Sequence, residues 1–185
     1  SEHLIRTLLA HQIARPEVKG LGQTCPALTV DALFERAWQR YQHHYLQING
    51  QFADVYPGVL TALQAFSAQG LPMACLTNKP LSFAEALLKE KSLDRFFVHV
   101  FGGDSFERKK PDPLPIRKTC EALGTETGKT LMVGDSSNDA QAAHAAGCPV
   151  VLVTYGYNHG QPVQNTPAAA WLDSLAQLPD CLRTA

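Results

Sequence analysis

From Tyr56 onward the sequence alternates between short apolar runs and longer segments of helical pattern. The helical segments are expected at 58–69, 80–91, 113–123, 137–146 and about 168–176. The apolar runs between them are Leu71–Leu76, Phe97–Phe101, Thr130–Val133 and Pro149–Tyr155. Strands separated by helices of this length require crossover connections, which join parallel strands. The pattern therefore predicts an α/β fold with a doubly wound, Rossmann-like parallel sheet.

Residues 1–52 show a different, wholly helical pattern. Leu4, Ile5, Leu8 and Leu9 recur at helical spacing, and a longer helix is expected at about 31–48 with Thr29 as a candidate N-cap. Glycine and proline break the stretch between the two helices, at Pro16, Gly20, Gly22 and Pro26. We expect two domains, a partial helical region over 1–52 and an α/β core over 53–185.

Composition excludes several classes of protein. The 185 residues include 16 basic and 17 acidic side chains, so no overall field attracts nucleic acid or an anionic membrane. The apolar runs have strand length, and no segment is long enough to span a bilayer. The start lacks the form of a secretion signal, and the cysteines form no CxxC pair. We expect a reduced, cytoplasmic protein that is a monomer or a homodimer. The cysteines are Cys25, Cys75, Cys120, Cys148 and Cys181.

Two acidic residues follow the apolar run at 130–133. Asp135 and Asp139 are four residues apart, so both carboxylates can face one cleft if a helix begins just after Ser136. At the carboxyl end of a parallel strand, such a pair suits a hard cation such as Mg²⁺. The alternative is structural, because Ser136 or Ser137 could cap the helix and Asp139 would favour its positive end.

A second set of polar groups follows the run at 71–76. Thr77 offers a hydroxyl, Asn78 offers an amide, and the helix after Pro80 offers a free N-terminus. These groups are typical of a phosphate-binding turn. The alternative is that Thr77 only caps the following helix.

Two further loops follow strands of the predicted sheet. Arg108–Pro113 contains Lys110 directly before Pro111, where an extended backbone can aim the ammonium group at an anion. The alternative is a solvated basic loop. The second loop, Tyr155–Gly160, could contact substrate or simply turn the chain.

The order of these groups is more informative than any one of them. A hydroxyl, a lysine and an acidic pair at successive strand ends would supply a phosphate contact, a countercharge and a metal anchor. Together they predict phosphoryl chemistry.

This order of motifs resembles the haloacid dehalogenase superfamily of phosphatases. Leu76–Pro80 is similar to the second motif of that family, Lys110–Pro113 to the third and Gly134–Asp139 to the fourth. The resemblance covers about Tyr56 to the C-terminus, and the helical region before it resembles part of the inserted cap of the family. Within the superfamily the likeness is greatest to bacterial phosphoglycolate phosphatases, in the segments 49–59, 102–104 and 156–160.

The resemblance implies a role for each matching residue. Thr77 would hydrogen-bond the transferring phosphoryl group with help from the Asn78 amide, and Lys110 rather than Lys109 would neutralise the charge. Asp135 would be a direct Mg²⁺ ligand, and Asp139 would support the metal through water or from the second shell. The expected activity is Mg²⁺-dependent hydrolysis of a small phosphorylated acid, 2-phosphoglycolate, or of a sugar phosphate.

One motif of the family is absent. The first motif, Asp-X-Asp-Gly-Thr at a strand end, supplies the nucleophile that forms an aspartyl-phosphate and the acid that protonates the leaving group. No remaining aspartate stands at the end of a spare apolar strand in this pattern. Those aspartates are Asp31, Asp54, Asp94, Asp104, Asp112, Asp173 and Asp180.

The missing motif also bears on the fold. In the family its strand lies between the strand that ends at Thr77 and the strand that ends at Asp135. Without it, buried backbone groups on both neighbours would be unpaired, at a cost of ~1–3 kcal/mol each. We therefore expect the chain to be an N-terminal truncation of a longer phosphatase. The alternatives to a truncation are a non-catalytic relative that binds phosphate or a partner, or a strand supplied by another chain. A separate alternative concerns the substrate: the chain could be another enzyme of the superfamily, such as a sugar phosphatase, phosphomutase or dehalogenase.

Overall fold

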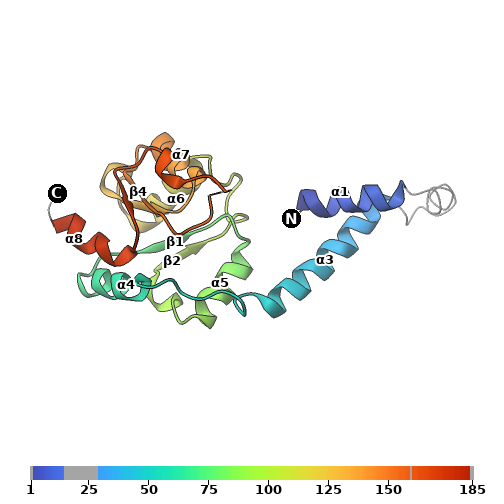
Figure 1. Cartoon of the computed structure of the whole chain (residues 1–185), viewed down its shortest axis with the longest axis horizontal. Coiled ribbons are helices and arrows are strands. Elements are labelled where there is room, and N and C mark those ends of the chain that lie inside the picture. The colour runs from blue at the N-terminus through green and yellow to red at the C-terminus, as the bar shows by residue number, and fades with distance from the viewer. Residues whose placement is uncertain (1, 15–28, 159, 184–185) are drawn as a thin grey trace. The chain divides into compact units, whose positions relative to one another are not determined.

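The computed structural model describes residues 2–14, 29–158 and 160–183, which form two compact units (Figure 1). The first unit spans 1–52 and the second spans 53–185. No helix within these described ranges is long and apolar enough to cross a membrane.

The first unit is a pair of packed helices. Helix α1 is Glu2–Ile13 and helix α3 is Val30–Ile48. Thr29 caps α3 as predicted, because its hydroxyl accepts a hydrogen bond from the Ala32 N–H at 3.2 Å. Arg6 joins the two helices through Asp31, at 2.8 Å, and through the ring of Phe34. The predicted break at Pro16, Gly20, Gly22 and Pro26 lies outside the described residues.

The second unit alternates helices and strands. Its strands are β1 (Ala74–Leu76), β2 (His99–Phe101), β3 (Met132–Gly134), β4 (Val150–Val153) and β5 (Ala170–Leu172). Its α-helices are α4 (Val59–Ala68), α5 (Leu81–Glu90), α6 (Leu114–Leu123), α7 (Ser137–Ala146) and α8 (Leu178–Arg183). Short 3₁₀ turns lie at Asp94–Phe96, Thr127–Lys129, Val163–Asn165 and Leu175–Gln177. Every strand pair is parallel, so the predicted Rossmann-like α/β fold is confirmed.

The prediction of a last helix at about 168–176 was wrong. Ala170–Leu172 is strand β5, which pairs with β4 in the register Leu152 to Trp171. Leu172 is buried, and Thr154 donates a hydrogen bond to Asp173 at 2.6 Å just beyond the pairing. The alanine-rich start of this segment favours a helix, but pairing with the most buried strand overrides that propensity.

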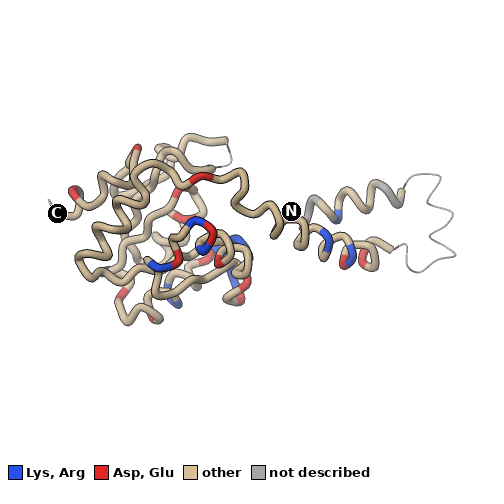
Figure 2. Tube along the Cα trace, turned by 90° about the horizontal axis from the view of Figure 1, so that it is seen from below, with Lys and Arg blue, Asp and Glu red and all other residues tan. Residues whose placement is uncertain are grey.

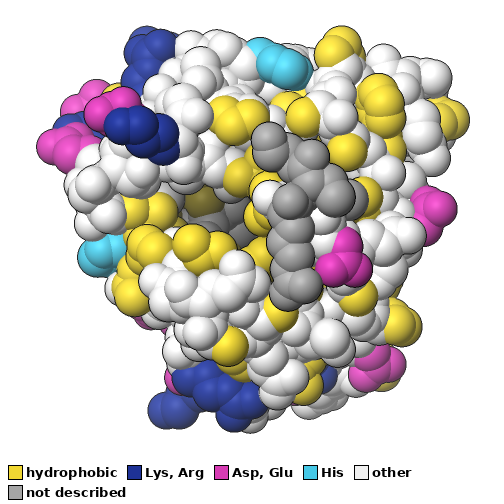
Figure 3. All heavy atoms as spheres, turned by 90° about the vertical axis from the view of Figure 1, so that its left-hand side faces the viewer, with side chains coloured by type: hydrophobic (Ala, Val, Ile, Leu, Met, Phe, Trp, Pro, Cys, Tyr) yellow, Lys and Arg dark blue, Asp and Glu magenta, His cyan; other side chains and the backbone are white. Residues whose placement is uncertain are grey.

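The core lies on both sides of β4, as a doubly wound sheet requires. Val150 and Leu152 pack on one face with residues of α6 and α7, whereas Val151 packs on the other with residues of α4 and α8. All of β4 is buried, while β1 and β3 are only partly buried. Figure 2 shows basic and acidic residues close together along the described part of the trace. On the face shown in Figure 3, apolar side chains lie toward the middle and charged ones toward the rim.

The strands form two separate sheets rather than one. β1 pairs with β2, and β3, β4 and β5 pair in that order. Within the described part of the chain, no strand joins the two sheets. The strands are also shorter than predicted, because runs such as Leu71–Leu76 form a ladder only at their carboxyl ends.

One edge of β1 faces away from its partner β2. The Thr77 N–H donates to Phe101 O at 3.0 Å, so Thr77 points its backbone groups toward β2. Backbone groups alternate in direction along a strand, and those of Ala74 and Leu76 therefore point to the opposite edge.

One edge of β3 is unpaired in the same way. The Met132 N–H donates to Pro149 O at 2.8 Å on the β4 side, so Leu131 and Val133 direct their backbone groups away from β4. Met132 and Leu76 pack against the same core cluster. We call these two edges, Ala74–Leu76 and Leu131–Val133, the β1/β3 edges.

Candidate active site

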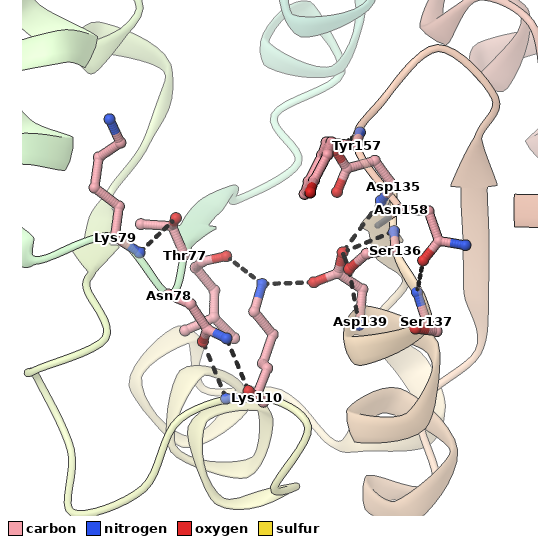
Figure 4. Close-up of polar contacts among 11 residues, drawn as sticks. Thr77, Asn78, Lys79, Lys110, Asp135, Ser136, Ser137, Asp139, Tyr157 and Asn158 are labelled. Atoms are coloured by element: carbon pink, nitrogen blue, oxygen red, sulfur yellow. Dashed lines mark hydrogen bonds and ion pairs between the residues drawn. The ribbon is translucent and has the colours of Figure 1, made fainter. Parts of the chain in front are cut away.

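The candidate site lies at the carboxyl ends of β1 and β3. Thr77 and Asn78 follow β1, Asp135 and Asp139 follow β3, and Lys110 lies between them on the segment that leads into α6 (Figure 4). The structure thus brings together all five residues that the sequence singled out.

Lys110 connects the two sheets. Its Nζ lies 2.7 Å from Asp139 Oδ1 and donates to Leu76 O at 2.8 Å. Leu76 O is one of the backbone acceptors on the β1/β3 edges, and Lys110 satisfies it. The side chain is only 8% exposed, whereas Arg108 and Lys109 are exposed. The predicted alternative of a solvated basic loop therefore describes Arg108 and Lys109 but not Lys110.

Asn78 holds the backbone of Lys110. Its Nδ2 donates to Lys110 O at 2.8 Å, and its Oδ1 accepts from the Lys110 N–H at 3.1 Å. This two-way contact fixes the main chain from which the lysine extends. The expectation that the Asn78 amide also helps to hold a phosphoryl group stays a prediction.

Thr77 does not cap the following helix. Its Oγ1 accepts a hydrogen bond from the Lys79 N–H at 3.1 Å, and the first residue of α5, Leu81, donates its N–H to Asp104 Oδ1 at 2.7 Å. The N-cap residue is Pro80, and Asp104 supplies the side-chain acceptor at the start of α5. The Gly103 N–H supports the same turn by donating to Lys79 O at 2.8 Å. Because the Thr77 hydroxyl accepts that bond, its own proton can be donated to a ligand.

Asp139 has the capping role that the sequence offered as the structural alternative, and it also pairs with Lys110, which the sequence did not predict. Helix α7 begins at Ser137, and Ser136 and Asp139 form a reciprocal capping box at its start. Asp139 Oδ2 accepts hydrogen bonds from the Ser136 hydroxyl at 2.7 Å, the Ser136 N–H at 3.2 Å and the Asp135 N–H at 3.1 Å. Its other oxygen holds Lys110. The carboxylate caps the helix and anchors the lysine at the same time.

The two carboxyl groups are tuned in opposite directions. Burial by itself would raise the pKa of Asp139, but the ammonium of Lys110 and hydrogen bonds from Ser136 and Asp135 lower it. For Asp135, burial raises the pKa, the Tyr157 N–H opposes this, and the nearby charge of Asp139 raises it further. Asp139 is therefore the ionised partner of Lys110, and Asp135 is the carboxylate that gains most from a cation.

Asp135 fits a magnesium ion better than Asp139 does. Both oxygens of Asp139 are engaged within the protein, whereas Asp135 accepts one described hydrogen bond, from the Tyr157 N–H to Oδ2 at 3.0 Å. No group of three His, Cys, Asp or Glu side chains gathers among the described residues. Mg²⁺ does not need such a group, because it commonly binds through one or two carboxylates and keeps waters and substrate oxygens as its other ligands.

Sequence reasoning missed three structural contacts of this site. These are the capping role of Asp104, the Tyr157 N–H on Asp135 and the buried side-chain contacts of Asn158. Tyr157 and Asn158 belong to the loop whose role the sequence left open, and the segment 102–104 was matched only to a family segment. Gly156 is the one signal that could have pointed there, because a Cβ at this position would lie 2.1 Å from the Cβ of Asp135. Only glycine permits so close an approach.

Comparison with known proteins places the chain in a family. The model of haloacid dehalogenase-like hydrolases matches residues 11–153. The chain therefore belongs to the haloacid dehalogenase-like hydrolases, which confirms the resemblance of its motifs.

Two relatives of this chain are phosphoglycolate phosphatases. A phosphoglycolate phosphatase of Thiobacillus denitrificans is 42% identical over 173 residues, which cover 94% of this chain and 76% of the relative. One of Pseudomonas syringae is 42% identical over 153 residues, covering 82% of this chain and 56% of the relative. This chain thus spans little more than half the length of the Pseudomonas protein.

A solved structure of a predicted phosphoglycolate phosphatase is also similar to this chain. The crystal structure of a predicted phosphoglycolate phosphatase from Haemophilus somnus superposes with a TM-score of 0.78 at 34% identity. The superposition covers 83% of this chain and 68% of that one.

The buried ion pair gives a test of the site's electrostatics. Asp139→Asn leaves Lys110 buried without its countercharge, which we expect to lower the free energy of unfolding at pH 7 by ~3–5 kcal/mol. Because the folded pKa of Asp139 is lowered, its contribution is present above the unfolded pKa of about 3.9 and is lost as the pH falls through the folded value. Urea unfolding should be measured from pH 7 to pH 3. The difference in the free energy of unfolding between wild type and Asp139→Asn should shrink below about pH 4.

Asp54→Asn, at an exposed carboxylate, serves as the control and should change stability little at any pH. A cost of Asp139→Asn that is small at pH 7, or that persists undiminished at pH 3, would contradict the ion pair.

Proposed function

We propose that this chain forms most of the active site of a Mg²⁺-dependent phosphomonoester hydrolase whose substrate is 2-phosphoglycolate. The observation that carries the proposal is the position of Lys110. Its buried ammonium lies between Leu76 O, at the end of β1, and Asp139, beyond the end of β3. The Thr77 hydroxyl, the Lys110 ammonium and the Asp135 carboxylate therefore lie around one point at the strand ends (Figure 4). The names of the relatives support phosphoglycolate as the substrate.

Lys110 and Thr77 would bind the phosphoryl group. An ammonium group has three N–H donors, and contacts with Asp139 and Leu76 account for two of them among the described residues. The third can donate to a phosphoryl oxygen. The Thr77 hydroxyl, oriented by the Lys79 N–H, can donate to another. These donors are already held in place, so little reorganisation is needed as charge develops on the phosphoryl oxygens.

Asp135 would hold the Mg²⁺. When bound, the ion would neutralise charge on the phosphoryl oxygens and the attacking carboxylate. Asp139 would support it without direct contact, since its Oδ2 fixes the Asp135 N–H and its Oδ1 fixes Lys110. The helical unit at residues 1–52 would act as the cap that selects the substrate.

The reaction further requires a carboxylate nucleophile beside Lys110. We propose that an extended segment pairs with the β1/β3 edges and carries an Asp-X-Asp sequence at its carboxyl end. The first carboxylate would attack phosphorus and form an aspartyl-phosphate, while the second gives its proton to the departing glycolate oxygen as the ester P–O bond breaks. Water then hydrolyses the acyl-phosphate, releasing phosphate and regenerating the carboxylate.

Adding the nucleophile tests this proposal directly. We expect the chain extended at its N-terminus by an apolar strand and Asp-X-Asp-Gly-Thr to release phosphate from 2-phosphoglycolate in a Mg²⁺-dependent manner. The matched control replaces the first Asp of the extension with Asn, which removes the nucleophile and should reduce release to the background of the unextended chain. Phosphate release is measured for 2-phosphoglycolate and glucose 1-phosphate, and halide release for a chloroacid.

Equal turnover with the Asn extension would contradict the proposed nucleophile. Faster turnover of the sugar phosphate or the chloroacid would replace the proposed substrate. Tight phosphate binding without turnover of any substrate would favour a non-catalytic phosphate-binding protein.

Substitution of the two neighbouring lysines in the chain extended with Asp-X-Asp-Gly-Thr provides a second test. Lys110→Ala should lower kcat by roughly 10²–10³-fold, the usual cost of removing one preorganised donor to a developing charge. Lys109→Ala removes an exposed ammonium of the same loop and should leave kcat nearly unchanged. Steady-state kinetics, with urea unfolding to confirm that each variant is folded, gives the ranking. The reverse order would move the catalytic role to Lys109.

A further inference from the structure

The loop that follows β4 contacts the turn at Asp135–Ser137, where we propose that Mg²⁺ binds. The Tyr157 N–H donates to Asp135 Oδ2 at 3.0 Å, and Figure 4 shows Tyr157 and Asn158 beside the turn at Asp135–Ser137. This is the loop whose role the sequence left open.

Asn158 ties this loop to the start of α7. Its side chain is buried, with only 8% of the residue exposed. Its Oδ1 accepts from the Ser137 N–H at 2.9 Å, and its Nδ2 donates to Gln161 O at 3.1 Å. The Gln161 N–H returns a hydrogen bond to Asn158 O at 2.8 Å. Ser137 opens α7, so Asn158 satisfies one of the N-terminal amides that a helix leaves unpaired.

Gly156 brings the loop against Asp135 itself. A Cβ at residue 156 would lie 2.1 Å from Asp135 Cβ and 2.3 Å from Oδ2. Such distances are far inside van der Waals contact, so any other residue would displace either the loop or the carboxylate. The loop therefore limits where Asp135 can lie on one side, while the Tyr157 N–H holds one of its oxygens.

We infer that Gly156–Asn158 is a clamp that fixes the rotamer of Asp135, with Asn158 as the positioning residue that anchors it. The purpose of the clamp rests on the proposed function, in which Asp135 holds Mg²⁺, but its existence does not. By engaging Oδ2 and restricting the side chain, it presents Oδ1 in one direction and lowers the entropic cost of binding a cation. Asn158 acts through the Tyr157 N–H, one residue away.

Nuclear magnetic resonance of the metal-free chain tests the clamp without reference to catalysis. In the wild-type protein, three-bond couplings should show one χ1 rotamer for Asp135, and the Tyr157 amide should be protected from hydrogen exchange. Asn158→Ala should average the Asp135 couplings over several rotamers and speed exchange at Tyr157 roughly tenfold, as expected for the loss of one hydrogen bond.

Two further variants separate positioning from general stability. Asn158→Asp keeps the acceptor for the Ser137 N–H, so it should retain the single rotamer of Asp135 even if Asn158→Ala does not fold. Ser174→Ala removes the side-chain cap of another helical turn, where Ser174 Oγ accepts from the Ala176 N–H at 3.3 Å. Ser174→Ala should alter neither the χ1 rotamer of Asp135 nor the hydrogen exchange of the Tyr157 amide.

Several results would overturn the inference. They are a single Asp135 rotamer with unchanged Tyr157 exchange in folded Asn158→Ala, rotamer averaging in Asn158→Asp, or the same changes in Ser174→Ala. None of them bears on whether the protein hydrolyses phosphoglycolate. Conversely, the absence of phosphatase activity would leave the measured rotamer of Asp135 as it is.

Discussion

The buried contact of Lys110 with Asp139 and Leu76 O is the interaction on which the rest of the site depends. The second unit contains two parallel sheets that no described strand joins, and this ammonium spans from the end of one to the turn beyond the end of the other. A charge so buried is favourable only when it is paired and hydrogen-bonded, and both conditions hold here. The pair therefore links the ends of the two sheets and places a buried cation at the proposed phosphoryl site.

The groups around this pair are held by neighbouring loops. Asn78 fixes the backbone of Lys110, and Asp104 caps the helix after the Thr77 turn. On the other side, Tyr157 and Asn158 hold the turn at Asp135. Lys110 and Asp135 are thus each supported by a residue from a different strand end, whereas the Thr77 hydroxyl is held by the Lys79 N–H of its own turn. Support of this kind keeps donors and ligands in place before the substrate arrives.

The sequence predicted the α/β fold and the meeting of the five site residues because both follow from local patterns. Alternating apolar runs and helices define the order of strands, and parallel strands bring their carboxyl ends to one edge. The strand at Ala170–Leu172 was missed because its identity depends on pairing with buried β4, which no local pattern reveals. Likewise, the sequence could not show that Asp139 serves as both cap and ion-pair partner, because Lys110 is 29 residues away in the chain.

Some features of the site depend on distant backbone groups and were beyond pattern analysis. The donor to the Asp135 carboxylate is the backbone N–H of Tyr157, and one acceptor for Lys110 is the backbone O of Leu76, so almost any residue type could supply these atoms. Gly156 was the exception, because its small size is itself the requirement.

The most direct test of the account is to locate a divalent cation on this chain. We expect Mn²⁺, added in substoichiometric amounts with inorganic phosphate, to broaden the amide signals of residues 135–137 and 157–158 first and those of 77–79 next. In Asp135→Asn this pattern should disappear while the remaining spectrum stays that of a folded protein. Broadening centred elsewhere, or the same pattern in Asp135→Asn, would contradict the claim that these strand ends form one metal- and phosphoryl-binding site.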